Sequence, residues 1–234
     1  MYSRELDGKT YTFGVSGKLW RDALLMYDHQ TRSLWAHITG EAIQGKLKGK
    51  KLTPLISMPQ IAWKTWMANY PQTKVLSIKK LESRENDNYA DYHKSQRAGV
   101  SGTQYTDKRL LNKSLVIGVQ FEDKNGKKHY RAYPLIQFAE TAIIQDTVNG
   151  VPLLIFHSKD SFATAVYKRT VDGKVENFEI KDDYLSQDSQ GRQWNLITGK
   201  AKQQDDVSLE RLTALNIYWF AWARFYPETS IYKP

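Results

Sequence analysis

The stretch "SLWAHITGEA", from Ser33 to Ala42, has a close counterpart in "RQWNLITGKA", from Arg192 to Ala201. Both contain a tryptophan shortly before the tripeptide Ile-Thr-Gly. Similar segments that recur at long spacing within one chain indicate an internal repeat. The question is whether the similarity extends beyond these ten residues.

Three further pairs of segments occur in the same order in both halves. They are "DGKTYTF" from Asp7 and "DGKVENF" from Asp172, "LTPL" from Leu52 and "LTAL" from Leu212, and "WKTWMANYPQT" from Trp63 and "WFAWARFYPET" from Trp219. Chance could produce one Trp-rich match, but it does not readily produce several matches in order. The sequence therefore predicts two related copies.

Each copy has the pattern of short strands followed by one helix. β-branched and aromatic runs alternate with polar turn residues, and Asp7-Gly8 and Asp172-Gly173 are hairpin signals. The paired tryptophans recur at helical spacing, and Pro71 and Pro227 end the two patterns. We predict a β-dominated α+β protein. Its two pseudo-repeated units are each an antiparallel sheet or partly closed barrel, capped by a Trp-rich helix whose tryptophans face the core.

The repeat also sets the predicted boundaries. Residues 1–78 form the N-terminal copy, residues 79–112 a polar connecting loop, and residues 113–234 the C-terminal copy, packed with the first as one body. The second copy has a long strand-rich stretch before its Asp-Gly turn and the first does not. We therefore expect the front half of the first copy to be missing.

Composition limits the function without naming it. The 234 residues carry a net charge of +9, which favours anionic partners but specifies none. Because the chain has no cysteine, disulfides, thiolate nucleophiles and cysteine metal sites are excluded. No run is long and apolar enough for a transmembrane helix. The five histidines lack metal-binding spacing, so we expect neither a metal nor a cofactor.

Four residues are candidates for catalysis. Arg131 and Tyr133 lie in "HYRAYPL" and Asp146 lies in "QDTVNG", and an Asp, Arg and Tyr set can perform acid–base work. Asp28 follows the apolar run "ALLMY", where a carboxylate often accepts backbone N–H groups in a turn. A similar aspartate, Asp188, occurs in the second copy, which favours a structural role.

Five further residues are candidates for ligand binding. Long polar loops on a rigid framework often carry binding residues. The loop supplies Arg84, Tyr89, Asp91 and Tyr92. The fifth, His37, shares a strand face with Trp35, so burial with one hydrogen bond is its alternative role.

Several of these stretches resemble a prokaryotic family of domains of unknown function, number 3179. The resemblance rests on "TFGVSGKLWRDALLMYDHQTRSLWAHITGEAIQGKLKGKKL", "YPQTKVLS", "RLLNKSLVIGV", "RAYPL", "DTVNGVPLLIF" and "WFAWARFYPETSIY". It implies an exported or membrane-associated protein, and therefore a periplasmic or extracellular location. It also implies an upstream counterpart of residues 116–162 with a Cys-Pro-x-Cys-Gly element. The corresponding "FHSKDSF" has no cysteine, and the family brings no established activity.

Two classes of function follow from the sequence. The first is an extracytoplasmic binding or scaffold domain for a small molecule, a glycan or a protein partner. The alternative is a hydrolase or transferase with an Asp/Arg/Tyr site between the two copies. A nucleic-acid partner is not expected, because it would require the lysines to form one continuous face. An enzyme should show a pocket where polar groups converge, and a binding domain a groove or an exposed apolar patch.

Overall fold

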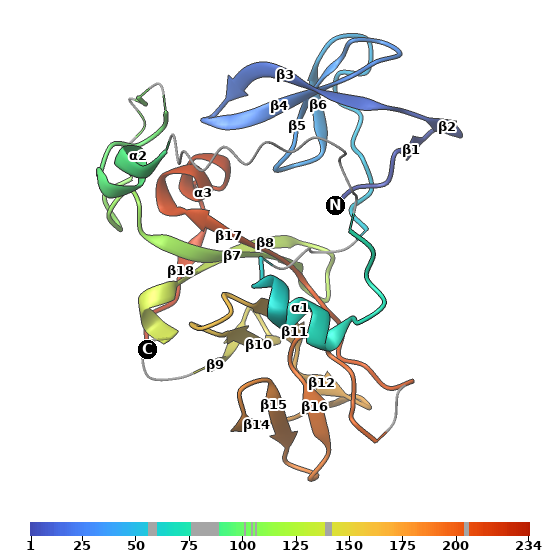
Figure 1. Ribbon diagram of the computed structural model, residues 1–234, viewed down its shortest axis with the longest axis vertical. Helices are drawn as coiled ribbons and strands as arrows, with labels where there is room; N and C mark the ends of the chain where they lie inside the picture. The colour runs from blue at the N-terminus through green and yellow to red at the C-terminus, as the bar shows by residue number, and fades with distance from the viewer. Residues whose placement is uncertain are drawn as a thin grey trace. The chain divides into compact units, whose positions relative to one another are not determined.

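The computed structural model describes residues 1–55, 60–75, 89–100, 102–103, 105, 107–138, 142–203 and 206–234. These residues are β-dominated and form several short, mostly antiparallel sheets (Figure 1). The chain divides into two compact units. Unit 1 comprises Met1–Met58, Arg97–Lys113 and Tyr218–Glu228, and unit 2 comprises Pro59–Gln96, Ser114–Ile217 and Thr229–Pro234.

Unit 1 is built on one four-stranded sheet in the order β3-β4-β5-β6, with the separate hairpin β1-β2 and one helix. Its elements are β1 (Glu5–Leu6), β2 (Lys9–Thr10), β3 (Phe13–Trp20), β4 (Ala23–Asp28), β5 (Leu34–Ala36), β6 (Glu41–Gln44) and α3 (Trp219–Phe225). The sheet is antiparallel throughout. Its strand order is open, so these residues do not form a closed barrel.

Unit 2 contains three larger sheets, in the orders β11-β10-β9, β14-β15-β16 and β17-β7-β8-β18. The last strand, β18, pairs in parallel with β8. The strands are β7 (Leu115–Glu122), β8 (Lys128–Pro134), β9 (Ile143–Val148), β10 (Val151–His157), β11 (Thr164–Lys168), β12 (Thr170–Val171), β13 (Lys174–Val175), β14 (Phe178–Asp182), β15 (Leu185–Asp188), β16 (Gln193–Asn195), β17 (Thr213–Tyr218) and β18 (Ser230–Ile231). The helices are α1 (Trp63–Asn69), α2 (Ala90–Lys94) and the 3-10 turn η1 (Leu135–Phe138).

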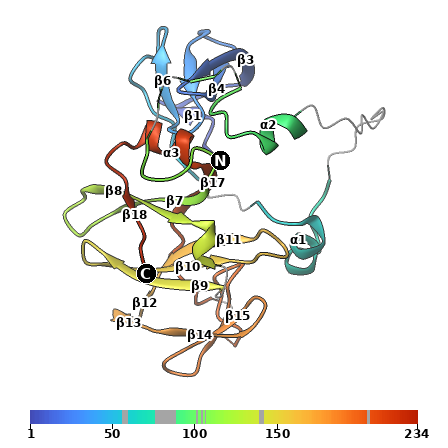
Figure 2. The same ribbon diagram turned by 90° about the vertical axis from the view of Figure 1, so that its left-hand side faces the viewer.

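The central strand β10 separates two hydrophobic cores of unit 2. Leu153 and Ile155 belong to one core, and Leu154 and Phe156 belong to the other. Successive side chains of a strand point to opposite faces, so a strand covered on both faces is apolar at every position. This is why "VPLLIF" lacks the alternation of a half-exposed strand. Figure 2 shows β10 between β9 and β11.

The Asp-Gly turns have the same local structure in both hairpins β1-β2 and β12-β13. Asp7 and Gly8 have φ angles of 51° and 72°, and Asp172 and Gly173 have φ angles of 50° and 77°. Glycine adopts this left-handed region without strain and aspartate tolerates it, so Asp-Gly supplies a two-residue turn. The hairpin prediction is confirmed at both places.

The Ile-Thr-Gly tripeptides also have equivalent surroundings. The hydroxyl of Tyr2 donates to the carbonyl of Ile38 at 2.8 Å, and that of Tyr167 donates to the carbonyl of Ile197 at 3.2 Å. A Cβ atom on Gly40 or Gly199 would lie 2.6 Å from the ring of the corresponding tyrosine. Both glycines also have φ above 70°. Glycine is thus required at each position for two reasons. The backbone has a positive φ angle, and the nearby tyrosine ring leaves no room for a Cβ atom.

The two Trp-rich helices differ in burial. Six of the seven residues of α3 are buried, and α1 has none buried. Trp219 is fully buried, whereas Trp63, at the matching sequence position, is 53% exposed. The prediction that the helix tryptophans face the core is therefore right for α3 and wrong for Trp63. Helical spacing identifies one face of a helix but not what covers it.

The compact units do not follow the sequence boundaries at residues 78 and 112. Helix α1 follows the N-terminal strands in the chain but belongs to unit 2, and α3 comes from the C-terminal copy but belongs to unit 1. Each helix therefore packs within the unit that contains the other copy's hairpins. The predicted boundaries divide the chain by repeated sequence, whereas the compact units divide it by contacts. The predicted boundaries are therefore not tested and stay a prediction.

Candidate functional site

Asp28 is buried in unit 1 and is surrounded by hydrogen-bond donors. It accepts from the indole Nε1 of Trp35 at 2.9 Å and from the backbone N–H and hydroxyl of Thr31. Burial by itself would raise the pKa of the Asp28 carboxyl, but the bonds from Trp35, Thr31 and Ser33 together hold the pKa below its usual value. All these donors belong to the turn after β4 or to the strand that follows it, which supports the structural role.

Asp188 has the same role in unit 2. Its carboxylate accepts from the indole Nε1 of Trp194 at 3.0 Å, from the backbone N–H groups of Gln190 and Arg192, and from the Arg192 guanidinium at 2.8 Å. Burial opposes ionisation, yet these bonds keep the pKa of the Asp188 carboxyl lowered. The Asp–Trp pair fixes the turn before a tryptophan-bearing strand in both units.

These two carboxylates make stability dependent on pH. Because their pKa values are lower in the folded than in the unfolded chain, the stability they contribute is complete above the unfolded pKa of about 3.9 and is lost as the pH falls through the folded pKa. We expect the urea midpoint to fall as the pH is lowered below about 4. The double variant Asp28→Asn, Asp188→Asn should be less stable at pH 7 and should lose less of its remaining stability on acidification. An unchanged pH slope would contradict this.

Three of the predicted catalytic residues meet in unit 2. The Arg131 Nε atom lies 2.8 Å from Asp146 Oδ2, and the Tyr133 hydroxyl donates to the same oxygen at 3.0 Å. The Arg131 guanidinium lies 5.7 Å from the ring centroids of both Tyr133 and Tyr232. Alternation along β8 puts Arg131 and Tyr133 on one face, and β9 supplies Asp146. Asp28 lies in unit 1 and does not belong to this cluster.

This cluster is closely packed. The side chains of Arg131 and Asp146 are 17% and 14% exposed. Tyr133 is fully buried, and this burial, reinforced by the Asp146 charge, raises the pKa of its hydroxyl well above the usual value. A phenol with a raised pKa is a poor general base at neutral pH. The geometry therefore fits a structural ion pair that joins β8 to β9 better than an acid–base centre.

A second polar cluster on the same face of β8 was missed by sequence analysis. His129 Nε2 lies 2.8 Å from Asp123 Oδ2, and His129 Nδ1 lies 2.8 Å from the Asn149 side chain. The bond from His129, with backbone bonds from Asn125 and Lys127, holds the pKa of the Asp123 carboxyl below its usual value. Period-two spacing of His129, Arg131 and Tyr133 was the available signal. The contacts with Asp123 and Asn149 tie the turn of hairpin β7-β8 to that of β9-β10.

The predicted ligand-binding residues occupy separate places. Arg84 lies outside the described residues. Tyr89 and Asp91 are exposed on or beside α2, and Tyr92 is partly buried there. In unit 1, His37 Nδ1 lies 2.7 Å from the Leu24 carbonyl oxygen, consistent with the alternative of one hydrogen bond to the fold. The binding roles of these residues stay predictions.

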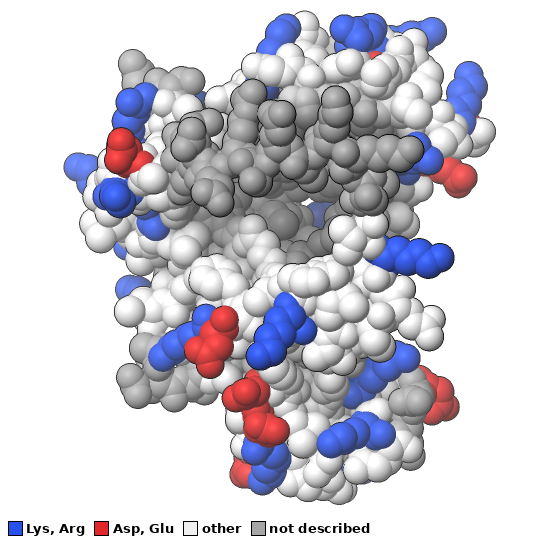
Figure 3. All heavy atoms as spheres, viewed as in Figure 1, with Lys and Arg blue, Asp and Glu red and all other residues white. Residues whose placement is uncertain are grey.

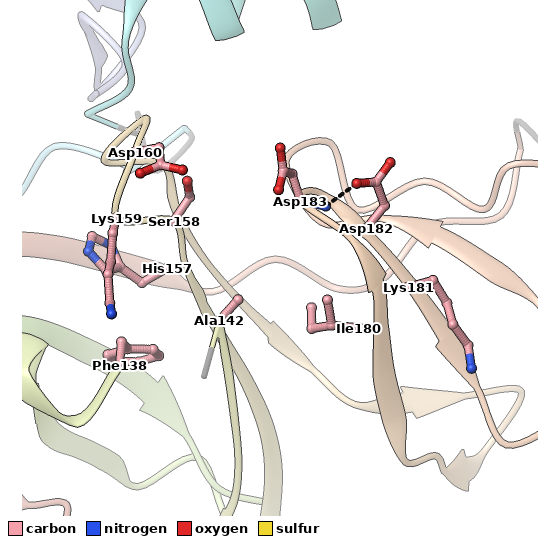
Figure 4. Close-up of a pocket in the computed structure, with 10 residues that line it drawn as sticks. All are labelled: Phe138, Ala142, His157, Ser158, Lys159, Asp160, Ile180, Lys181, Asp182 and Asp183. Carbon is pink, nitrogen blue, oxygen red and sulfur yellow. Dashed lines mark hydrogen bonds between the residues drawn. The ribbon is translucent and has the colours of Figure 1, made fainter. Parts of the chain in front are cut away.

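Unit 2 contains a cleft of about 440 Å³ that none of the nine predicted residues lines. One wall is the segment after β10, with Ser158 and Asp160, and the other is the end of hairpin β14-β15 (Figure 4). The described residues that line it are Phe138, Ala142, His157, Ser158, Lys159, Asp160, Ile180, Lys181, Asp182 and Asp183. Figure 4 places Asp160 and Asp183 at the tops of the opposite walls.

His157 connects the cleft to the core. It is 4% exposed, and it packs edge-on against Phe138 and Phe162 at 5.6 and 5.4 Å. Its Nδ1 atom lies 3.1 Å from the Thr164 hydroxyl. Burial lowers the pKa of the imidazole and outweighs the opposing carbonyl of Ala163. His157 is therefore neutral at pH 7 and serves the cleft as a fixed polar group.

Residues 1–229 match the family described as "Protein of unknown function (DUF3179)". The chain belongs to the DUF3179 family. No curated protein and no solved structure matches it. The DUF3179 description names no activity.

Three further observations concern metal sites, membrane-spanning helices and surface charge in this DUF3179 chain. Among the described residues no three His, Asp or Glu side chains gather as a metal site. Within the same residues, no helix is long and apolar enough to cross a membrane. On the face that Figure 3 shows, Lys and Arg are separated by uncharged surface and by Asp and Glu, and they do not form one continuous strip.

Proposed function

We propose that this DUF3179 chain is a binding domain and that the cleft of unit 2 is its small-molecule site. The observation that carries the proposal is the cleft itself. It combines an apolar floor, formed by Phe138 and Ile180, with polar groups on both walls. Ligand sites commonly combine apolar surface with a few polar groups that fix orientation.

The position of the walls supports a site of defined shape. The backbone N–H of Ala62 donates to the carbonyl of Ser161 at 2.7 Å, next to the wall residue Asp160. The Thr65 hydroxyl lies 3.5 Å from the Tyr184 hydroxyl, next to the wall residue Asp183. The first turn of α1 thus contacts the chain neighbour of a wall residue on each side of the cleft. Walls held by one helix keep their spacing before a ligand arrives, which lowers the entropic cost of binding.

The alternative function is a hydrolase or transferase that uses Asp28, Arg131, Tyr133 and Asp146. The convergence of the last three favours it. It receives less support than binding, because Asp146 is already engaged by Arg131 and Tyr133 and none of the three lines the cleft of unit 2. A glycan or protein partner instead of a small molecule remains within the binding proposal, as does a periplasmic or extracellular location, which rests on the family.

We also propose that residues 1–78 and 113–234 are related copies. The Asp-Gly hairpins, the buried Asp–Trp pairs and the Tyr–Gly contacts support this, since each occurs once in each copy and in the same order. The helix ends agree as well. The C-cap residues Tyr70 and Tyr226 have φ, ψ values of −135°, 67° and −129°, 72°.

The binding proposal is tested with a variant that fills the cleft. Ile180 is 36% exposed and lines the cleft, so Ile180→Trp should occupy the floor without disturbing either core. Val175→Trp is the matched control, because Val175 is 57% exposed in the same unit and lies outside the lining. Ligands are identified by native mass spectrometry of the natively purified protein and by a thermal-shift screen of metabolites.

We expect a ligand whose affinity falls at least roughly tenfold in Ile180→Trp and is unchanged in Val175→Trp. Equal binding by both variants would place the ligand elsewhere and end the proposal for this cleft. Turnover of a compound, abolished by Arg131→Lys and retained in Ile180→Trp, would favour the enzymatic alternative.

A further inference from the structure

The carboxylates at the mouth of the cleft have no cationic partner within the described part of the chain. Asp160 and Asp183 are exposed and make no ion pair there. Lys181 also lines the cleft, but its Nζ atom lies 3.0 Å from Glu179, and Figure 4 shows it pointing away from the two aspartates. The walls thus carry three carboxylates, those of Asp160, Asp182 and Asp183, and two lysines, Lys159 and Lys181, above an apolar floor.

A comparable hairpin end in unit 1 does hold a cation. The tip of hairpin β3-β4 carries Asp22, which accepts from the Arg224 guanidinium of α3. The same guanidinium donates to the Thr103 hydroxyl at 3.0 Å and lies 6.0 Å from the Tyr105 ring centroid. A carboxylate, a hydroxyl and an aromatic ring therefore surround one guanidinium group.

The cleft of unit 2 has these three kinds of group, but no guanidinium among the described residues that line it. Its hairpin tip contacts α1 through Tyr184 and Thr65, as the tip of β3-β4 contacts α3. When the two Trp-rich helices are aligned on their tryptophans, the position of Arg224 corresponds to Ala68. Asp183, the Ser158 hydroxyl and the Phe138 ring line the cleft.

We propose that the cleft binds a guanidinium or ammonium group of its ligand, so that the ligand class is an organic cation. This inference rests on the proposed binding function and adds the chemistry of the ligand. The carboxylates on the two walls would take the cationic group, and Phe138 and Ile180 would contact its aliphatic part. The cation can come from a free amine or from an Arg side chain of a peptide.

The strength of binding should be modest and dependent on salt. Ion pairs with exposed carboxylates contribute little and are screened by salt. The net charge of +9 repels cations at long range, so recognition has to come from the local pair of aspartates. We expect dissociation constants on the order of 1 mM for a minimal cation, weakening as salt is raised.

The test compares charged and neutral probes of the same shape by NMR titration of the full chain. N-butylguanidine and N-butylurea form the free pair, and N-acetylated, C-amidated Gly-Arg-Gly and Gly-citrulline-Gly form the peptide pair. The variants are Asp183→Asn and Asp160→Asn, with the exposed Asp206→Asn as the matched control outside the cleft. Ile180→Trp tests whether the probes bind in the cleft.

We expect each cation to bind at least roughly tenfold more tightly than its neutral partner, and this preference to disappear in the double variant Asp160→Asn, Asp183→Asn. The Asp206→Asn variant should bind the charged probes as tightly as the parent chain does. Tighter binding of the Arg peptide than of N-butylguanidine would identify a peptide source, and the reverse a free small cation. Equal binding of charged and neutral probes, or unchanged binding by the double variant, would overturn the inference. If a neutral ligand then binds to the parent chain and not to Ile180→Trp, the proposed binding function stands and only the cationic ligand class is wrong.

Discussion

Asp188→Ala will lower the free energy of unfolding by about 3–5 kcal/mol, because it leaves several buried donors without an acceptor. The Trp194 indole, the backbone N–H groups of Gln190 and Arg192, and the Arg192 guanidinium all donate to this carboxylate. Removing one side chain therefore costs more than one hydrogen bond. Urea unfolding followed by far-UV circular dichroism measures the loss in the transition that includes unit 2.

Two control variants separate the causes of this loss. Asp188→Asn keeps one acceptor oxygen and the shape but removes the charge, so it should lose less than Asp188→Ala. Asp206→Ala changes an exposed aspartate of the same unit and should stay within about 0.5 kcal/mol of the parent. A loss below about 1 kcal/mol for Asp188→Ala would show that water replaces the carboxylate, and the structural role argued for it would be wrong.

Trp219→Ala and Trp63→Ala will have very different effects, although the two tryptophans begin matching sequence motifs. Trp219 is fully buried, donates from Nε1 to the Asp107 carbonyl at 3.1 Å and lies 5.0 Å from the Arg109 guanidinium. Its removal should cost about 3–5 kcal/mol, the usual loss for a buried aromatic side chain. Trp63 is 53% exposed, so its removal should cost about 1 kcal/mol or less.

The comparison is made by urea unfolding of both variants at the same pH. Trp219→Phe is an informative third variant, because it keeps most of the apolar contact and removes the indole N–H; its loss should lie between the other two. Similar losses for Trp63→Ala and Trp219→Ala would mean that the burial of the tryptophan side chain does not determine how much stability its removal costs. The large asymmetry argued for α1 and α3 would then be wrong.

Much of the local structure could be predicted from the sequence. Asp7-Gly8 and Asp172-Gly173 predict hairpins because few other dipeptides adopt the two left-handed conformations such turns need. The recurrence of Asp28 and Asp188 before tryptophan strands favoured a structural role, and the Asp–Trp hydrogen bonds agree with it. These features depend on residues that are close together in the chain, so they can be predicted from the sequence.

The candidate site was less accessible to sequence reasoning. The sequence grouped Arg131, Tyr133 and Asp146, and they do meet, but their close packing changes the chemistry they can perform. The cleft was missed because its two walls, around residues 158–160 and 180–183, contain ordinary polar residues with no motif. Nothing in either segment indicates that the other lies opposite it.

The sequence by itself determined the β-dominated class, the hairpin turns, the two Trp-rich helices and the family. These depend on local conformational preferences and on the short-range alternation of apolar residues. Only the tertiary structure decided which unit each helix joins, which of two matching tryptophans is buried, and where a cleft opens. Those outcomes depend on contacts between segments far apart in the chain, where burial of apolar surface and not local preference sets the free energy.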